Sequence, residues 1–166
     1  MRIAPFRGAY NFLSNMYTCP NGVYYDGIEY TSSENAYQAQ KIKETIIRLE
    51  ISRMSAVDAK QFKRKARNSE RKITFVQDFD MHKVDIMTKI VYAKFAQNLE
   101  LAKRLFATGD AELVEEGWWH DNFWGNCTCG RPQCKEEGFN QLGVILMSVR
   151  SLLQQDIHTE EFHETA

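Results

Sequence analysis

The sequence lacks a long apolar segment. No stretch approaches the ~20 apolar residues needed to span a bilayer, and the first ten residues, MRIAPFRGAY, do not contain the apolar run of a secretory signal peptide. We therefore expect a cytoplasmic protein that does not associate with membranes. Because thiols stay reduced in that compartment, the cysteines are expected to be free thiols or metal ligands before they are disulfides.

The sequence also lacks an excess of charge of either sign. The 21 lysine and arginine residues nearly balance the 22 aspartate and glutamate residues, and the formal net charge is -1. Only a local patch could therefore bind nucleic acid or phosphate. Residues 60–72 are such a basic stretch, with Glu70 as their single acid. We interpret them as a solvated helix end, and the alternative is a rim that attracts phosphates or contacts nucleic acid.

Several catalytic motifs are absent as well. The chain has no Walker loop, GxGxxG, HExxH or GxSxG, so P-loop NTP hydrolysis, Rossmann redox chemistry and elbow-type serine hydrolysis have no motif to support them. What remains is a carboxylate-centred site with aromatic and amide neighbours. That combination suits cleavage of a glycosidic bond, in which a carboxylate activates water or stabilises an oxocarbenium-like transition state.

The residues that are present predict several helices and a few short strands. A length of 166 residues favours one domain. Val84, Met87, Val91 and Phe95 step by three, four and four residues, which is the spacing of a buried helix face. The expected elements are a loop or irregular edge strand at 6–17, a strand pair at 23–30 turning at Asp26-Gly27, a helix from Thr31 that continues with a break to Met54, a helix after an N-cap at Ser55, two helices at 80–106 with a turn near Asn98, and a buried helix at 140–153.

Residues 30–41, YTSSENAYQAQK, carry the most distinctive polar pattern. Thr31 and Glu34 fit a capping box, which alone would explain the acid. Glu34, Gln38 and Lys41 fall at i, i+4 and i+7 and share one helix face, and a polar face at a helix N-terminus can also line a ligand pocket. Backbone amides, the helix dipole and Lys41 would lower the pKa of Glu34. A low pKa favours a base or cation stabiliser over a general acid.

Residues 118–125, WWHDNFWG, hold all three tryptophans. A tryptophan face can stack on a nucleobase, which contributes roughly 1–3 kcal/mol per base, although large aromatics in a core would be equally ordinary. His120 has no evident partner that would make it a catalytic base. The sequence here therefore allows either a ligand-binding loop or a packed aromatic cluster.

The cysteines after this segment have the spacing Cys-x-Cys-x4-Cys, a weaker zinc signal than the usual two to four intervening residues. We expect reduced thiols and no metal. The alternative is a structural zinc ion at Cys19, Cys127, Cys129 and Cys134, with His120 as another candidate for the fourth ligand.

Six segments of the chain follow one another in an order typical of a known family. They are residues 6–17 (FRGAYNFLSNMY), 25–41 (YDGIEYTSSENAYQAQK), 94–98 (KFAQN), 105–115 (LFATGDAELVE), 121–127 (DNFWGNC) and 140–150 (NQLGVILMSVR). Together they resemble the NADAR superfamily, also called the YbiA-like N-glycosidase family. The resemblance implies a helix-dominated α+β fold, a compact multihelical single domain with a few short strands. We place this domain at residues 1–153, followed by a polar tail at 154–166.

The resemblance also implies a pocket for ribose phosphate-containing ligands, with no cofactor. Glu34 takes the place of the family's acid and Lys41 that of its helix-closing lysine, and we expect these two to be catalytic. Asn35 stands where a histidine is commoner. The expected substrate-binding residues are Arg7, Phe12, Ser14, Asn15, Asp121, Trp124, Gly125 and Asn140.

These residues lead to one function and one alternative. The first is an N-glycosidase that cleaves the bond between a base and ribose phosphate, either in riboflavin-pathway ribosylaminopyrimidine phosphates or in an ADP-ribosylated base. The alternative is a module that binds ADP-ribose or NAD without hydrolysis. Both would take a ribose phosphate-containing small molecule or an ADP-ribosylated substrate as partner.

Overall fold

The computed structural model describes residues 1–67 and 70–164, with side chains described up to residue 156. The chain divides into two compact units. We call Asn15–Leu99 the central unit, and Met1–Ser14 together with Glu100–Ala166 the terminal unit. None of the described helices is long and apolar enough to cross a bilayer.

The central unit begins with a β-hairpin. Strand β2 (Val23–Tyr25) pairs antiparallel with β3 (Ile28–Tyr30). The turn residues Asp26 and Gly27 both have positive φ, at 49° and 79°. A type I′ hairpin turn requires positive φ at both positions, and Asp-Gly is among the pairs that adopt it most readily. The predicted strand pair and its turn are therefore confirmed.

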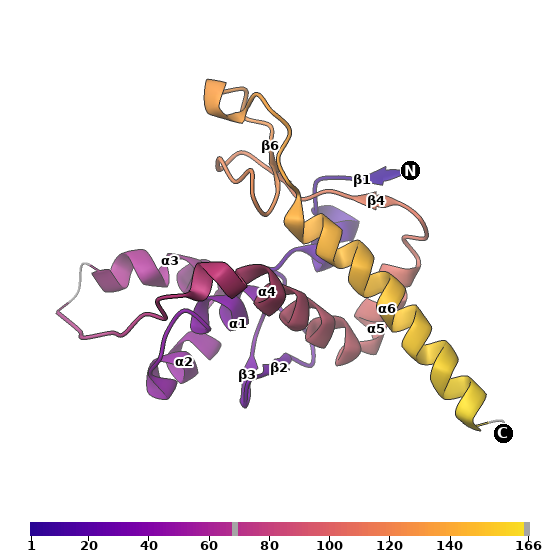
Figure 1. Cartoon of the computed structure of the whole chain (residues 1–166), viewed down its shortest axis with the longest axis horizontal. Coiled ribbons are helices and arrows are strands. Elements are labelled where there is room, and N and C mark those ends of the chain that lie inside the picture. Colours follow the sequence, from indigo (N-terminus) through magenta and orange to yellow (C-terminus); the bar gives the residue numbers. More distant parts are fainter. Residues whose placement is uncertain (68–69, 165–166) are drawn as a thin grey trace. The chain divides into compact units, whose positions relative to one another are not determined.

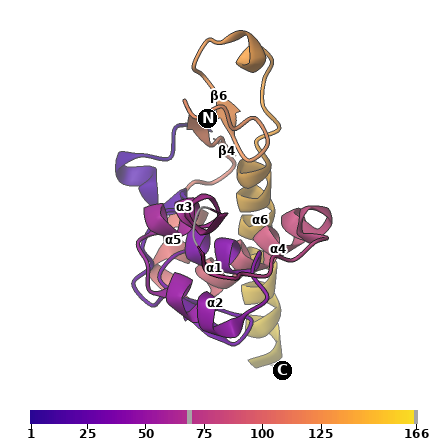
Figure 2. The same cartoon turned by 90° about the vertical axis from the view of Figure 1, so that its left-hand side faces the viewer.

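Four helices follow the hairpin in the central unit. They are α1 (Ser33–Ala39), α2 (Thr45–Ser52), α3 (Ala56–Arg67) and α4 (Phe79–Ala96). Helix α1 packs against the other three and lies in the middle of the unit (Figures 1 and 2). The predicted break in the first helical segment falls between α1 and α2. The predicted N-cap of α3 is also confirmed, because Ser55 Oγ accepts a hydrogen bond from the Asp58 N–H at 3.1 Å.

The buried face of α4 starts later than predicted and contains a lysine. Met87, Ile90 and Val91 are almost fully buried, whereas Val84, which was predicted on this face, is 38% exposed. Lys94 follows Val91 by three residues on the same face and is only 1% exposed. Periodicity thus located the helix and most of its buried face correctly, and only Val84 lies outside that face.

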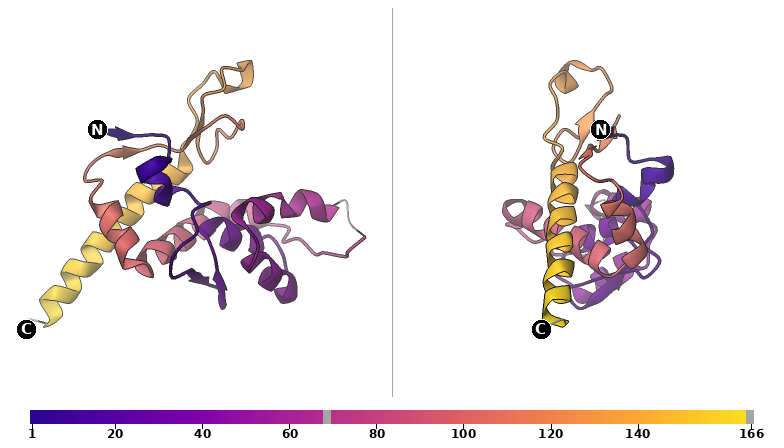
Figure 3. Two further views of the ribbon diagram at one scale, coloured as in Figure 1. Left: turned by 180° about the vertical axis from the view of Figure 1, so that it is seen from behind. Right: turned by 90° about the vertical axis from the view of Figure 1, so that its right-hand side faces the viewer.

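The terminal unit combines short parallel strand pairs with helices. Strand β1 (Arg2–Ile3) pairs with β4 (Glu112–Leu113), and β5 (Glu116–Gly117) pairs with β6 (Asn126–Cys127). Helix α6 packs against β4 (Figure 3). The helical elements of this unit are the 3₁₀ helices η1 (Gly8–Leu13) and η2 (Pro132–Cys134), α5 (Leu99–Phe106), whose first residue belongs to the central unit, and α6 (Gln141–Glu164).

Two predictions for the terminal unit need correction. The segment at 6–17, expected to be a loop or irregular strand, contains the helix η1. Helix α6 continues to Glu164, whereas the predicted helix ended at residue 153. Its buried residues include Leu146 and Val149, whereas Val144 is 46% exposed. The helix-dominated α+β class itself is confirmed.

Candidate functional site

The N-cap of helix α1 lies one residue later than predicted. Ser32 is the N-cap, and its Oγ accepts a hydrogen bond from the Asn35 N–H at 3.2 Å. The Ser32 hydroxyl donates in turn to Asn35 Oδ1 at 2.5 Å. The predicted pairing of Thr31 with Glu34 is therefore wrong. The carboxylate of Glu34 is not used to cap the helix, which leaves it available for another role.

Asn35, which stands where a histidine is commoner in the family that the sequence resembles, has a structural role. Its Nδ2 donates to the carbonyl oxygens of Ile51 at 2.7 Å and Met54 at 2.9 Å, and the residue is fully buried. Asn35 thus joins the start of α1 to the end of α2. This link fixes the position of the helix that carries Glu34.

The face of α1 that carries Glu34 is buried rather than solvated. Glu34, Tyr37 and Gln38 are 7%, 5% and 9% exposed. Glu34 Oε1 accepts a hydrogen bond from Gln38 Nε2 at 2.8 Å, and Gln38 Oε1 accepts one from Lys41 Nζ at 2.9 Å. Glu34 Oε2 has no protein hydrogen-bond partner among the described residues. An amide therefore connects a buried carboxylate to an ammonium group, while one carboxylate oxygen stays available.

Lys41 lies in a partly desolvated position. Burial lowers the pKa of Lys41 to about 8, and the Glu34 carboxylate opposes this shift. Its Nζ lies 4.5 Å from the ring centroid of Tyr37 and 5.5 Å from that of Phe79, within the range of cation–π attraction. Lys41 is thus mainly protonated at neutral pH and loses its proton only slightly above it.

Asn15 lies at the start of the central unit and contacts α1 through its backbone. Its carbonyl oxygen accepts a hydrogen bond from the Glu34 N–H at 2.9 Å. The side chain is 8% exposed, and its Nδ2 lies 3.3 Å from Met87 Sδ, a weak acceptor. Asn15 Oδ1 is buried with no hydrogen-bond partner among the described residues. A buried amide oxygen without a partner costs free energy, which is consistent with an acceptor kept for a ligand.

In the terminal unit, Asp121 shapes the loop that carries Trp124. Asp121 Oδ1 accepts hydrogen bonds from the N–H groups of Phe123 at 3.1 Å and Trp124 at 2.8 Å, in the manner of an Asx turn. The half-buried ring of Trp124 meets Phe123 edge-on, with centroids 5.0 Å apart. Trp118 and Trp119 are instead 68% and 64% exposed. Trp124 is therefore the least exposed of the three tryptophans.

Asn140 and two glycines join this loop to α6. Asn140 Oδ1 accepts from the Glu115 N–H at 3.0 Å, and its Nδ2 donates to the Leu113 carbonyl at 2.8 Å. A Cβ on Gly125 would lie 2.5 Å from the Glu115 carbonyl oxygen, and one on Gly143 would overlap the Leu113 carbonyl. Both ends of the Asn140 amide are thus used by the backbone, and contact with ribose stays a prediction.

The predicted residues around η1 have different environments. Phe12 is 1% exposed, and the guanidinium carbon of Arg104 lies 4.0 Å from its ring centroid. Arg104 also donates to the Ala9 carbonyl at 2.6 Å. Phe12 is therefore part of the packing in the terminal unit, whereas Arg7 is exposed and Ser14 is partly exposed.

His120 and three cysteines lie close together. His120 Nδ1 is 3.3 Å from Cys129 Sγ, 3.4 Å from Cys134 Sγ and 3.9 Å from Cys127 Sγ. Burial raises the pKa of the Cys134 thiol to about 12, and the two neighbouring thiols add to this shift. Cys19 is not in this group, because it lies buried in the central unit. The fourth candidate metal ligand beside the three cysteines is therefore His120 and not Cys19.

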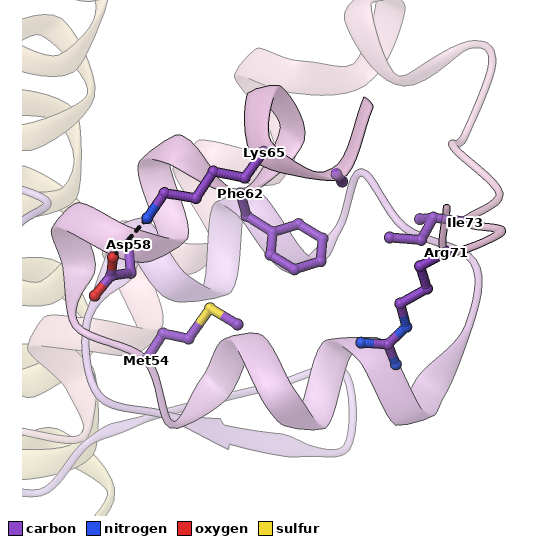
Figure 4. Close-up of a pocket in the computed structure, with 7 residues that line it drawn as sticks. Met54, Asp58, Phe62, Lys65, Arg71 and Ile73 are labelled. Carbon is purple, nitrogen blue, oxygen red and sulfur yellow. Dashed lines mark hydrogen bonds and ion pairs between the residues drawn. The ribbon is translucent and has the colours of Figure 1, made fainter. Parts of the chain in front are cut away.

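A pocket of ≈ 390 Å³ lies beside the basic stretch of the central unit, and Figure 4 shows its residues. It is lined by Met54, Asp58, Phe62, Lys65, Ala66, Arg71 and Ile73. Met54, Phe62 and Ile73 make its lining mainly apolar, which does not suit a phosphate group.

Two basic side chains beside this pocket are paired with acids. Lys65 Nζ lies 2.9 Å from Asp58 Oδ1, and Arg71 makes two hydrogen bonds to Glu50 at 2.6 and 2.7 Å. These pairs support the interpretation of the stretch as a solvated helix end. Residues 68–69 lie outside the described residues, and binding of phosphate or nucleic acid here stays a prediction.

The structure places the predicted site residues in three groups. They are Asn15, Glu34 and Lys41 in the central unit, Asp121, Trp124, Gly125 and Asn140 between β5 and α6, and Arg7, Phe12 and Ser14 in or next to η1.

Two residues that contact the Glu34 group, and the buried Lys94 of α4, were not predicted as site residues. The i+4 spacing from Glu34 placed Gln38 on the correct face, but did not indicate that its amide connects the acid to the lysine. Phe79 lies beyond the helix break, so sequence spacing could not relate it to Lys41. Lys94 had a usable signal, because it follows two apolar core residues at helical spacing.

Comparison with known proteins gives a consistent result. Residues 5–154 match the NADAR domain. N-glycosidase YbiA of Escherichia coli is 34% identical over 146 residues, covering 87% of this chain and 82% of that protein. Riboflavin biosynthesis protein VVA0006 of Vibrio vulnificus is 40% identical over 148 residues, covering 88% of this chain. This chain spans only 36% of the Vibrio protein.

A solved structure agrees with these sequence matches. The NMR structure of the E. coli protein YbiA matches this fold with a TM-score of 0.73 and 30% sequence identity, over 94% of this chain and 85% of that one. The molecule is therefore a helix-dominated α+β protein of the YbiA type. The chain belongs to the NADAR domain family, as the resemblance predicted.

Proposed function

We propose that this protein is an N-glycosidase that hydrolyses the bond between a base and ribose phosphate. The observation that carries the proposal is the buried series Glu34–Gln38–Lys41, with Asn15 next to its start. Burying a carboxylate and an ammonium group costs free energy that an apolar face would avoid. Such an arrangement is typical of functional sites, and the names of the YbiA relatives support the reaction class.

Glu34 would act on water or on the ribosyl cation. Gln38 holds Oε1, so that Oε2 can accept a proton from a water molecule whose oxygen attacks the ribose C1′. The C–N bond breaks as the new C–O bond forms. The base leaves with the bonding electron pair and takes up a proton from solvent. In a dissociative transition state the same carboxylate would stabilise positive charge on the ribose.

Lys41 and Asn15 would position the reacting groups. Protonated Lys41 contributes positive charge near Glu34 and can orient it through Gln38 or attract a substrate phosphate. Asn15 Oδ1, which has no partner among the described residues, can accept a hydrogen bond from a ribose hydroxyl. In the terminal unit, Trp124 has the flat, partly exposed ring that stacking on a base requires.

Two substrate classes follow from the shared chemistry. The name of the Vibrio relative supports ribosylaminopyrimidine phosphates of riboflavin synthesis, and the family resemblance also includes ADP-ribosylated bases. Both contain a ribose phosphate whose C1′ carries a nitrogen. At the bond that is cleaved, the two substrate classes differ only in the base that leaves.

The test is to incubate the full chain with ribosylaminopyrimidine phosphates, NAD, ADP-ribose and ADP-ribosylated DNA and to detect released base or ribose phosphate by mass spectrometry. Glu34→Gln keeps the size of the side chain and should lower turnover ~10²–10³-fold, which is typical for loss of one transition-state group. Glu29→Gln is the matched control, because Glu29 is exposed on β3.

Two outcomes would contradict the proposal. Near wild-type turnover by a folded Glu34→Gln variant would remove Glu34 from the chemistry. Calorimetric binding of ADP-ribose or NAD, with no base released from any of the four substrates, would instead establish the non-hydrolytic binding module.

A further inference from the structure

The His120 group has the chemistry of a metal centre. His120 Nδ1 and the Sγ atoms of Cys127, Cys129 and Cys134 all lie within 4.8 Å of one another. One imidazole nitrogen and three sulfurs make up a ligand set that structural zinc sites use. We propose that these four side chains bind one structural zinc ion.

The interatomic distances fit a tetrahedral ion. Zinc bonds of about 2.3 Å to sulfur and about 2.0–2.1 Å to nitrogen at tetrahedral angles place nitrogen and sulfur about 3.6 Å apart. The three observed distances from His120 Nδ1 to sulfur are 3.3, 3.4 and 3.9 Å. These values lie on both sides of the expected one. Little adjustment of the loop would be needed to bind the ion.

Backbone hydrogen bonds hold the segments that carry the four ligands. Cys127 ends β6, which pairs with β5, and its N–H donates to Asn122 Oδ1 at 2.8 Å. Cys134 ends η2, whose first turn is closed by the hydrogen bond from the Cys134 N–H to Arg131 at 2.9 Å. Gly130 has a positive φ of 74°, which reverses the chain between Cys129 and η2. The ligands therefore come from a strand end, a turn and a 3₁₀ helix that are each held by their own hydrogen bonds.

The donor set favours zinc over calcium and magnesium. Thiolate and imidazole ligands exclude calcium and magnesium, which prefer oxygen. Four protein ligands complete a tetrahedral shell and leave no open position for water, which indicates a structural rather than a catalytic ion. Binding would release the three thiol protons to solvent, and the positive ion would offset the repulsion between the thiolates.

The ion would stabilise a loop with little regular structure. Between β5 and α6, the described residues form only the short elements β6 and η2. His120 directly precedes Asp121, whose carboxylate fixes the backbone at Trp124. The ion would therefore tie the start of the Trp124 turn to η2. This proposal does not rest on the N-glycosidase proposal, because metal content is measured independently of activity.

The first measurement is the zinc content of the full chain, expressed with zinc and purified without chelators, by mass spectrometry of metals. We expect about one zinc ion per chain. His120→Ala and Cys134→Ser should each lower this content at least tenfold. Cys19→Ser is the matched control and should keep it, because Cys19 lies outside the cluster. Cobalt substituted for zinc should give the intense visible absorption of a tetrahedral thiolate site.

A second measurement covers variants that do not fold. Titrating the wild-type chain with a mercurial reagent should release zinc to a chromogenic chelator as three thiols react. Zinc below about a tenth of an ion per chain would overturn the proposal. Retention of zinc by both ligand variants, or a wild-type mass two hydrogens lower that shows a disulfide among these cysteines, would also overturn it.

Discussion

The two regions that carry the candidate site residues are held in opposite ways. In the central unit, the Glu34 face of α1 is buried between helices, and its polar groups bond mainly to other side chains. In the terminal unit, the loop from Trp118 to Asn140 is largely exposed, and its polar side chains bond to backbone groups. The first region is fixed by core packing and the second by side-chain capping of the backbone. Substitutions in the two regions should therefore have different effects.

This difference predicts that the first region is sensitive to charge state and the second to backbone geometry. A buried carboxylate–amide–ammonium series depends on the charge states of its members, so conditions such as pH should change its activity before its fold. The conformation of the loop depends on backbone hydrogen bonds and close glycine contacts. Substitutions there should therefore change both the stability of the protein and its affinity for a ligand. The predictions below test each half of this contrast.

After Glu34→Gln, the largest effect is expected for Lys41. Its pKa of about 8 means that the charged form is present below this pH and lost above it. If catalysis needs the charge, kcat/KM should be level near neutrality and fall about tenfold per pH unit above about pH 8. Lys41→Met should lower kcat/KM ~10²-fold at pH 7 and remove this pH dependence.

Lys41→Arg is the control for charge alone. Arginine stays protonated well above pH 8, so the fall in kcat/KM should move to higher pH even if the rate at pH 7 is lower. A pH profile that is the same in the wild type and in Lys41→Arg would assign the titration to another group.

The next effect concerns Trp124 in the terminal unit. Trp124→Ala should weaken binding of ADP-ribose or another base-containing ligand by roughly 1–3 kcal/mol if the ring stacks on the base. Trp118→Ala is the comparison, since Trp118 is 68% exposed. Calorimetric titration of both variants measures the difference. Equal affinities would show that Trp124 does not contact the ligand.

Gly143 tests the geometry of the same unit. A Cβ at this position would overlap the Leu113 carbonyl and approach Asn140, so Gly143→Ala should lower the free energy of unfolding by about 1–3 kcal/mol. Val144→Ala, next in sequence but 46% exposed, should change it much less. Urea denaturation followed by circular dichroism compares the two, and equal midpoints would mean that α6 can shift at no cost.

Much of the fold could be predicted because its signals are local. Ser55 capped α3 as expected, and the Asp26-Gly27 turn set the hairpin, since each depends on residues within a few positions. The shared face of Glu34 and Lys41 likewise followed from helical spacing. The family resemblance predicted a chemical role for that face, which spacing alone could not distinguish from a cap.

The rest depended on contacts distant in sequence. Burial of α1 on all sides follows from packing against α2, α3 and α4, which no local pattern encodes. Phe79 begins α4, which follows α2 and α3 in the chain, yet its ring lies near Lys41. His120 lies beside the cysteines because the loop folds back on itself. Its spacing from them in the sequence does not match that of a usual zinc motif. Each of these features is set by tertiary structure.

The smallest effect tests the register of the cap that positions Glu34. Thr31, Ser32 and Ser33 are all good N-cap residues, so local propensity did not decide among them. The structure selects Ser32 because Asn35, three residues later, also bonds to the end of α2. Ser32→Ala should therefore cost about 1 kcal/mol of unfolding free energy, whereas Thr31→Ala should cost only a few tenths. If thermal unfolding gave the reverse order, the cap would begin at Thr31 and Glu34 would be its partner. The burial of the Glu34 carboxylate would then be explained by helix capping. It would no longer support a chemical role for the central unit.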